Sequence, residues 1–226
     1  MVHPSIRAPT ILLFDLDGTL VDTAPDLSKA LNSLLQRHGK PPLPREAIRP
    51  YVSHGSAGML GLGFDKQPTD PGFDVLRREF LDVYAENLCE ESKLFPGMAG
   101  VLNELERRNL SWGVVTNKPD FLTRPLLDAL ALSDRCCCII SGDTLPNRKP
   151  HPAPMYFAAD QADADPVQCI YIGDAPRDIE AGNRAGMQTL VARYGYLSDQ
   201  DRPEKWGANG AIDAPADLLE WIDAHS

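Results

Sequence analysis

The sequence predicts an α/β fold, with a mostly parallel sheet and a separate all-helical insertion. Short apolar runs rich in β-branched residues alternate with segments of helical periodicity along most of the 226-residue chain. These runs lack strict apolar–polar alternation, as expected for strands that are covered on both faces. Between residues 22 and 92 the alternation stops, and helical patterns follow one another without a convincing strand.

Six segments are expected to form strands of the sheet. Five are clearly apolar, and the sixth, near Ala211–Asp213, is weaker. The five are, in chain order, Ile11–Asp15, Trp112–Thr116, Cys137–Ser141, Cys169–Gly173 and Thr189–Ala192. Amphipathic segments between them are expected to be helices that cover the sheet.

The helical insertion follows the first strand. A helix is expected from about Pro25, with Thr23 and Asp26 placed as a capping box. The proline-rich segment KPPLPREAIRP ends it, and the pattern of Val75–Leu88 predicts a last long helix. We therefore expect a discontinuous α/β core around a helical domain, with the core formed by residues 1–21 and 93–226 and the helical domain by residues 22–92.

Composition and charge exclude several classes of protein. With 43% hydrophobic and 24% charged residues, the chain is globular. Its formal net charge of −10, without a basic stripe, argues against binding of nucleic acid. No apolar run approaches membrane length, and the first ten residues, MVHPSIRAPT, lack the apolar core of a signal peptide. We expect a cytoplasmic protein that binds neither nucleic acid nor membranes.

The five cysteines favour the same compartment. Cys136, Cys137 and Cys138 are consecutive, and adjacent cysteines pair poorly with each other. No CxxC or Cys/His spacing indicates a metal site. We expect these residues to be small apolar members of a buried strand, with the reduced thiols of a cytosolic protein.

Acidic residues follow two of the predicted strands. Asp15 and Asp17 come after the run ILLF, and Asp174 comes after CIYIG. Carboxylates beside buried strands are costly unless a cation compensates them, and Mg²⁺ is the simplest such cation. Asp15 and Asp17 can both face the crevice at the carboxyl edge of the sheet, where ligands bind in open α/β folds. One can attack phosphorus as a nucleophile, and the other can transfer a proton to the leaving oxygen. The pattern favours metal-dependent phosphoryl transfer over a purely structural role in turns or caps.

Asp174 and Asp178 have the spacing of two acids on the first turn of a helix. Because a helix dipole favours negative side chains there, capping is an alternative for both. The apolar strand and the Gly173 that precede Asp174 favour a metal role for it. Asp178 can orient a metal-bound water.

Two further segments carry groups suited to phosphate. Thr116 and Asn117 follow the strand WGVVT, and a hydroxyl with backbone N–H groups at that junction can bind phosphate, although ordinary loop composition would look the same. Lys149, in NRKPHP, can pair with a phosphoryl group or be a solvated surface lysine.

In the helical insertion, one loop is a candidate for substrate selection. Ser53, His54, Gly55 and Ser56 precede a helical pattern. Such a loop can present N–H groups to a substrate carboxylate or to sugar hydroxyls. A serine-capped helix N-terminus explains the same residues equally well.

DLDGT, VVTN, RKP and GDAPRD occur in the order typical of the haloacid dehalogenase superfamily, which the chain resembles over most of its length. The helical insertion falls where that superfamily carries its small cap domain. The resemblance implies a Rossmann-like core, a small all-helical cap and Mg²⁺-dependent phosphatase chemistry through an aspartyl-phosphate.

The resemblance also implies roles for the matching residues. Asp15 would be the nucleophile and a metal ligand, and Asp174 would complete the metal site. Asp17 would be the general acid/base and would bind Mg²⁺ through its backbone carbonyl. The phosphoryl group would be held by Thr116, Asn117 and Lys149, with Asp178 supporting the site through water or Lys149. Substrate selection would lie in the cap segment that contains Ser53, His54, Gly55 and Ser56.

Within the superfamily, LVDTAPDL and VVTNKP resemble phosphoglycolate phosphatases. WGVVTNKP and the tail YGYLSDQDRPEKWGA are similar to the bacterial N-acetylmuramic acid 6-phosphate phosphatases.

We expect a monomer or homodimer that hydrolyses the phosphate monoester of a small carboxylated metabolite. A β-phosphoglucomutase-type isomerase shares the core motifs and is the alternative. Dehalogenase chemistry is disfavoured because it needs the nucleophile but not Asp17 and the metal set.

Overall fold

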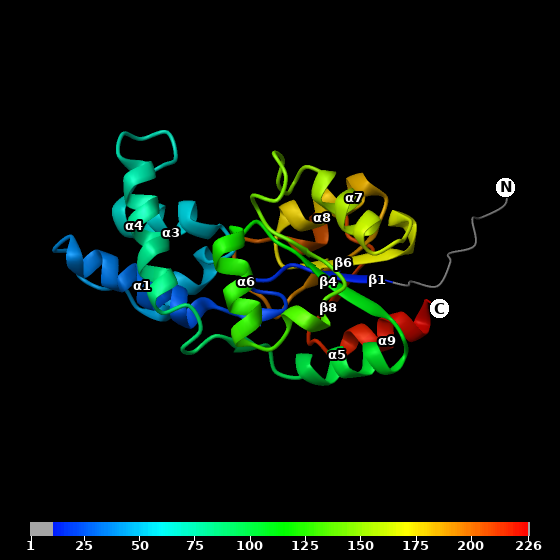
Figure 1. Cartoon of the computed structure of the whole chain (residues 1–226). Helices are drawn as coiled ribbons and strands as arrows, with labels where there is room; N and C mark the ends of the chain where they lie inside the picture. Colours follow the sequence, from blue (N-terminus) through cyan, green and yellow to red (C-terminus); the bar gives the residue numbers. More distant parts are fainter. Residues whose placement is uncertain (1–10, 226) are drawn as a thin grey trace.

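The computed structural model describes residues 11–225 and has three layers, with a central sheet between two sets of helices and a group of helices beyond one end of the sheet (Figure 1). Residues 1–10, on which the expectation about a signal peptide rests, lie outside the described residues. Within residues 11–225, no helix is both long enough and apolar enough to cross a membrane.

The sheet has six parallel strands in the order β5-β4-β1-β6-β7-β8. Leu12, in the middle of β1, is in register with Trp112 of β4 and Ile170 of β6. The predicted mostly parallel sheet is therefore confirmed. The strand bounds are β1 Ile11–Phe14, β4 Ser111–Val115, β5 Ile139–Ile140, β6 Cys169–Gly173, β7 Gln188–Ala192 and β8 Gly210–Ile212.

The cysteine-rich segment differs from its prediction. Strand β5 contains only two residues and follows a short 3₁₀ turn at Ser133–Arg135, although the backbone of Cys137 and Cys138 also bonds to β4. Cys138 is buried, but Cys137 is exposed and Cys136 is half-buried, so the expectation of a buried strand is wrong for these two. All five cysteines have free thiols.

Alternate residues of the strands pack against helices on opposite faces of the sheet. Leu13 belongs to a cluster formed with helices α7 (Ala153–Gln161) and α8 (Pro176–Ala185). Leu12 and Phe14 belong to the larger cluster, which includes the helices of the other face. Those helices are α5 (Met98–Arg107), α6 (Asp120–Ala129) and α9 (Asp217–Ala224). Burial on both faces explains why the strands read as continuous apolar runs.

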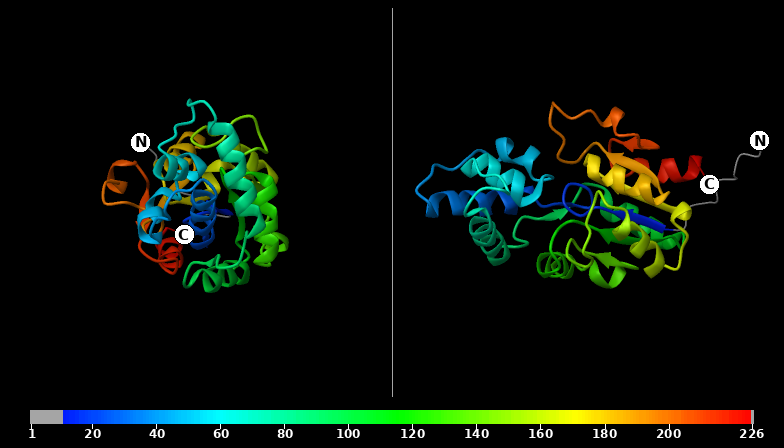
Figure 2. Two further views of the ribbon diagram at one scale, coloured as in Figure 1. Left: turned by 90° about the vertical axis from the view of Figure 1, so that its left-hand side faces the viewer. Right: turned by 90° about the horizontal axis from the view of Figure 1, so that it is seen from above.

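The insertion contains the helices α1, α2, α3 and α4, which stand apart from the sheet in the view from above (Figure 2, right). The apolar face of α1 packs against that of α4, as the periodicity of both predicts, with Leu31 and Phe80 in one buried cluster. The bounds are α1 Ala24–Arg37, α2 Arg45–Ile48, a 3₁₀ turn Arg49–Tyr51, α3 Gly55–Phe64 and α4 Phe73–Glu86.

A small ribbon connects the insertion to the core and was not predicted. β2 (Val21–Asp22) pairs antiparallel with β3 (Lys93–Leu94). Each strand has two residues, too few to produce a periodic pattern in the sequence. Both crossings between insertion and core thus lie side by side, close to the predicted domain boundaries at residues 22 and 92.

The predicted capping box at the start of α1 is wrong. The Thr23 hydroxyl donates to Asp17 Oδ1 at 2.6 Å, and no side chain caps the helix there. Asp26 instead accepts hydrogen bonds from the backbone N–H of Glu91 and from the N–H and hydroxyl of Ser92. These partners lie far along the chain, so local spacing could not indicate them.

Candidate active site

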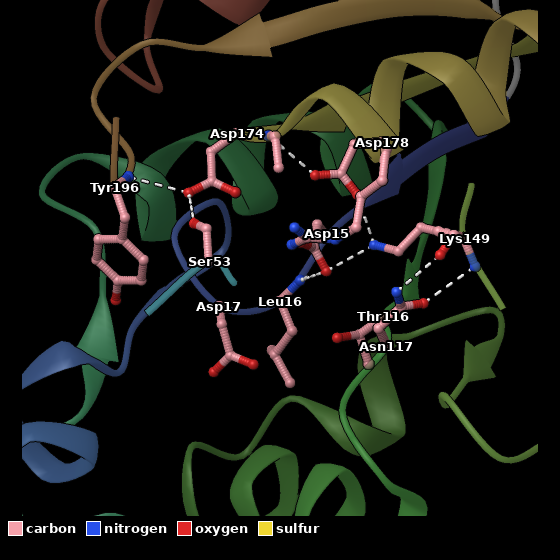
Figure 3. A network of polar contacts seen from close by, with 12 residues as sticks. Asp15, Leu16, Asp17, Ser53, Thr116, Asn117, Lys149, Asp174, Asp178 and Tyr196 are labelled. Carbon is pink, nitrogen blue, oxygen red and sulfur yellow. Dashed lines mark hydrogen bonds and ion pairs between the residues drawn. The ribbon is translucent and has the colours of Figure 1, made fainter. Parts of the chain in front are cut away.

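Three predicted site residues follow adjacent strands of the sheet. Asp15 follows β1, Thr116 follows β4 and Asp174 follows β6, and β1 lies between the other two strands. Because the strands are parallel, these side chains meet at the carboxyl edge of the sheet (Figure 3). The expected crevice is therefore present.

Glycine is required at one position beside this edge. Gly18 has φ +86°, a conformation that L side chains rarely adopt, and a Cβ there would lie 2.1 Å from Asp174 Oδ2. The turn after β1 can approach the Asp174 carboxylate only because residue 18 has no side chain.

The Lys149 side chain is fully buried at this edge of the sheet, where its ammonium has several partners. Nζ lies 2.9 Å from Asp15 Oδ1 and 2.8 Å from Asp178 Oδ1. It also donates to the Val115 carbonyl at 2.9 Å and to the Tyr171 hydroxyl at 2.7 Å. The alternative of a solvated surface lysine is wrong, and Nζ is fixed beside the Asp15 carboxylate.

Asp15 is held in its ionised form. Burial by itself would raise its pKa, but the charges of Lys149 and Arg177 outweigh burial and place the pKa of Asp15 below its usual value. The Leu16 N–H donates to Asp15 Oδ1 at 2.8 Å, which favours the carboxylate further. Arg177 Nη2 lies 3.9 Å from Asp15 Oδ2, so cations face both oxygens. An ionised carboxylate is the form needed for nucleophilic attack.

Asp174 has the opposite electrostatic environment. Burial, followed by the charges of Asp178 and Asp15, raises the pKa of Asp174 to about 7. Its Oδ2 accepts from the Ser53 hydroxyl at 2.5 Å and from the Tyr196 N–H at 2.9 Å. Its Oδ1 is buried and has no hydrogen-bond partner. A buried carboxylate oxygen without a donor is compensated well by a cation.

Asp15, Asp174 and Asp178 form a buried carboxylate cluster typical of magnesium sites, with one oxygen of each within 4.8 Å of the others. An all-oxygen donor set suits a hard divalent cation such as Mg²⁺. Together with the unpartnered Asp174 Oδ1, this cluster fits the predicted metal. Asp178 is in the first turn of α8, as predicted, and its Oδ2 accepts from the Ala175 N–H at 3.0 Å.

Asp17 lies outside this carboxylate cluster and has its own cation. Lys118 Nζ lies 3.0 Å from Asp17 Oδ1, and the Tyr84 hydroxyl is 3.1 Å from the same ammonium. The Thr23 hydroxyl donates to the same Asp17 oxygen, and the Asp17 carboxylate lies apart from the Asp15 carboxylate (Figure 3). Sequence reasoning gave Lys118 no role, because its partners come from distant segments of the chain.

Thr116 and Asn117 occupy the junction between β4 and α6. Thr116 is buried, and its hydroxyl oxygen accepts from the Lys118 N–H at 3.2 Å. The Asn117 side chain exchanges two hydrogen bonds with the backbone of Lys149 and so joins two loops of the site. Because the side-chain amide of Asn117 is used in these two hydrogen bonds, the backbone N–H of Asn117 is the group that can bind a phosphate.

The core and the cap share a cavity of about 590 Å³. Its lining includes Asp15, Asp17, Thr116, Asn117 and Lys149 from the core, together with the cap segment predicted to select the substrate, Ser53, His54, Gly55 and Ser56. The Ser53 hydroxyl reaches Asp174, so this segment also contacts the carboxylate cluster.

Tyr196 and Arg177 were missed by sequence reasoning. The Tyr196 hydroxyl accepts from the N–H groups of Thr23 and Ala24, and its own N–H donates to Asp174. Tyr196 therefore ties the start of α1 to the carboxylate cluster. The available signals were the family-like tail that begins at Tyr194 and the position of Arg177 inside the GDAPRD motif.

The fold and the site define a class of enzyme that the comparisons confirm. The family model for haloacid dehalogenase-like hydrolases matches residues 12–192, and the chain belongs to this family. The predicted enzyme class, a phosphatase of the haloacid dehalogenase superfamily, is thereby confirmed together with its fold.

Similar proteins include two kinds of phosphatase. The N-acetylmuramic acid 6-phosphate phosphatase of Pseudomonas putida is 41% identical over 213 residues, which cover 94% of this chain and 96% of the relative. A phosphoglycolate phosphatase of Xanthomonas campestris pv. campestris is 40% identical over 215 residues, covering 95% and 97%. The crystal structure of a predicted phosphoglycolate phosphatase from Haemophilus somnus matches with a TM-score of 0.83 at 30% identity, covering 95% of this chain and 98% of that one.

Proposed function

We propose that the chain is a Mg²⁺-dependent hydrolase of phosphate monoesters that acts on a small carboxylated metabolite. The observation that carries this proposal is the buried cluster of Asp15, Asp174 and Asp178 at the sheet edge where ligands bind, with Lys149 paired to Asp15 and Asp178. In this proposal Asp15, Asp174 and the backbone carbonyl of Asp17 hold the metal, and Asp178 supports it. The bound Mg²⁺ would supply positive charge next to the transferring phosphoryl oxygens.

The side chains support a two-step reaction. The ionised Asp15 carboxylate attacks phosphorus, and the ester oxygen leaves with a proton from Asp17. Water then attacks the phosphorus of the aspartyl-phosphate, and Asp17 takes a proton from that water. The bond between the Asp15 oxygen and phosphorus breaks, which releases inorganic phosphate and restores the Asp15 carboxylate. The hydroxyl of Thr116, the backbone of Asn117 and the ammonium of Lys149 would bind the phosphoryl oxygens.

For the substrate, we propose N-acetylmuramic acid 6-phosphate ahead of 2-phosphoglycolate. Similar proteins carry both names, and both compounds have a carboxylate. The shared cavity of about 590 Å³ is within the usual range for ligands much larger than a two-carbon acid. This size favours the sugar acid.

We also propose that residues 22–92 form a cap domain on a core of residues 1–21 and 93–226, and that the protein is a monomer or homodimer in the cytoplasm. The ribbon of β2 and β3 supports these boundaries, because the chain crosses between the two parts there.

The test measures kcat/KM for phosphate release from both compounds, with Mg²⁺ and with excess EDTA. We expect release from the sugar acid to be faster and to stop in EDTA. Release of phosphate that EDTA leaves unchanged would refute the metal requirement. The isomerase alternative predicts that a β-sugar 1-phosphate yields its 6-phosphate isomer instead of free phosphate.

A further inference from the structure

The cap end of the cavity holds a cation without an acidic partner. Arg77, on α4, is half-buried and lines the cavity, and its Nε donates to Ser56 Oγ at 3.2 Å. Among residues 11–225, no carboxylate forms an ion pair with the Arg77 guanidinium. Asp74, one turn earlier on α4, also lines the cavity but forms no ion pair with Arg77. The Arg77 guanidinium can therefore form an ion pair with an anionic ligand.

Three other cations that line the cavity already face carboxylates. Lys149 is paired with Asp15 and Asp178, Lys118 with Asp17, and Arg177 lies 3.9 Å from Asp15. Arg148 also lines the cavity without an ion pair among the described residues, but its side chain is exposed, whereas Arg77 is half-buried. The whole chain has a net charge of −10, so its general field repels anions. An unpaired guanidinium inside the cavity supplies the local attraction that an anionic ligand needs.

Ser56 adds donors beside Arg77. It lies in the first turn of α3, where backbone N–H groups have no acceptor within the helix. Ser56 and the next residue, Ala57, both line the cavity. The Ser56 hydroxyl, the Arg77 guanidinium and the start of α3 therefore all belong to the part of the lining that comes from the helical insertion, whereas Asp15 belongs to the part that comes from the core.

We propose that Arg77 and Ser56 form a subsite for a carboxylate of the substrate, remote from the phosphoryl group. The guanidinium would pair with both carboxylate oxygens, which also fixes the orientation of the ligand. This inference rests on the proposed function and adds to it a residue that determines specificity. Arg77 takes no part in phosphoryl transfer itself.

The test compares Arg77→Gln with Arg78→Gln. Arg78 is the next residue on α4, is exposed and does not line the cavity, so it is a matched control. Each variant is assayed with two pairs of esters in which only the first member carries a carboxylate: N-acetylmuramic acid 6-phosphate against N-acetylglucosamine 6-phosphate, and 2-phosphoglycolate against ethyl phosphate. Loss of a charged hydrogen-bonded pair predicts that Arg77→Gln lowers kcat/KM roughly 10- to 100-fold for at least one acid and leaves its carboxylate-free partner within about twofold. Arg77→Lys should restore part of the loss.

Equal losses on the acid and on its carboxylate-free partner, or no loss on either acid, would overturn the subsite. A second measurement separates this outcome from failure of the proposed reaction. Calorimetry on the Asp15→Asn protein gives the dissociation constants of the same esters without turnover. Weaker binding of the acid alone after Arg77→Gln supports the subsite even if the wild-type protein hydrolyses none of the esters, whereas unchanged binding of both acids refutes it.

Discussion

At the scale of single residues, the pair formed by Lys118 and Asp17 joins the proposed proton-transfer group to the cap. Lys118 contacts the Asp17 carboxylate and, through the Tyr84 hydroxyl, helix α4 of the cap. Lys118→Met removes the cation and leaves the Asp17 carboxylate without its charged partner. We expect kcat to fall by roughly 10- to 100-fold, the usual worth of a charged hydrogen bond, with a smaller change in KM. Steady-state kinetics checks this, with Lys205→Met, an exposed lysine, as the control. Equal activity of the two variants would refute this role of Lys118.

Asp174 gives the site a pH dependence. Its pKa is raised to about 7, so between about pH 4, the ordinary carboxyl range, and pH 7 the metal-free folded protein keeps a proton that the unfolded chain has lost. The stability of the metal-free protein therefore falls as pH rises through this window. Below pH 7, magnesium must displace the proton from Asp174. The affinity for Mg²⁺ should therefore fall about tenfold for each unit by which the pH is lowered below 7.

The measurement is the melting temperature with and without Mg²⁺ at pH 6 and pH 8. We expect the increase caused by Mg²⁺ to be clearly larger at pH 8, and absent at both pH values in Asp174→Asn. An increase of the same size at both pH values in the wild-type protein would contradict the raised pKa of Asp174.

At the scale of elements, Asp26 fixes the end of the cap to the start of α1. Its buried carboxylate accepts from the N–H groups of Glu91 and Ser92 and from the Ser92 hydroxyl. Asp26→Ala leaves these donors unsatisfied and should lower the free energy of unfolding by about 2–4 kcal/mol. Urea unfolding tests this, with Asp82→Ala, an exposed residue on α4, as the control. A loss no larger than that of the control would refute this role of Asp26.

The elements that could be predicted are those with a local signal. The apolar runs before Asp15 and Asp174 predicted β1 and β6 because both faces of these strands are buried along their whole length. The ribbon of β2 and β3 could not be predicted, since each strand has two residues. The prediction for the consecutive cysteines was wrong for a different reason. The backbone of Cys137 and Cys138 bonds to β4, but the side chains of Cys136 and Cys137 are not buried.

In the candidate site, the residues at strand ends could be predicted from the sequence, whereas the contacts between the helical insertion and the core could not. Strand ends placed Asp15, Thr116 and Asp174 at one edge, since parallel strands end on the same side of a sheet. The contact of Ser53 with Asp174 and that of Lys118 with Tyr84 arise from docking of the cap on the core. The spacing of residues within either segment cannot predict these contacts.

At the scale of the whole molecule, the proposed chemistry and the proposed substrate selection lie in different parts of the chain. The core holds the carboxylate cluster and the buried Lys149, which support the proposed chemistry, and the cap closes a shared cavity with its own donors. Because the net charge of −10 repels anions, a phosphorylated acid depends on local cations in the cavity for attraction. The reaction is thus attributed to the core and the choice of substrate to the cap.

The most direct test of this account is phosphate release from N-acetylmuramic acid 6-phosphate by the Asp15→Asn protein in the presence of Mg²⁺. Asparagine keeps the size of the side chain but removes the nucleophilic charge, so release should fall by at least about 10⁴-fold. Asp160→Asn, an exposed residue on α7, should act like the wild-type protein. Turnover by Asp15→Asn within tenfold of the wild type would contradict the central claim that Asp15 attacks the phosphoryl group.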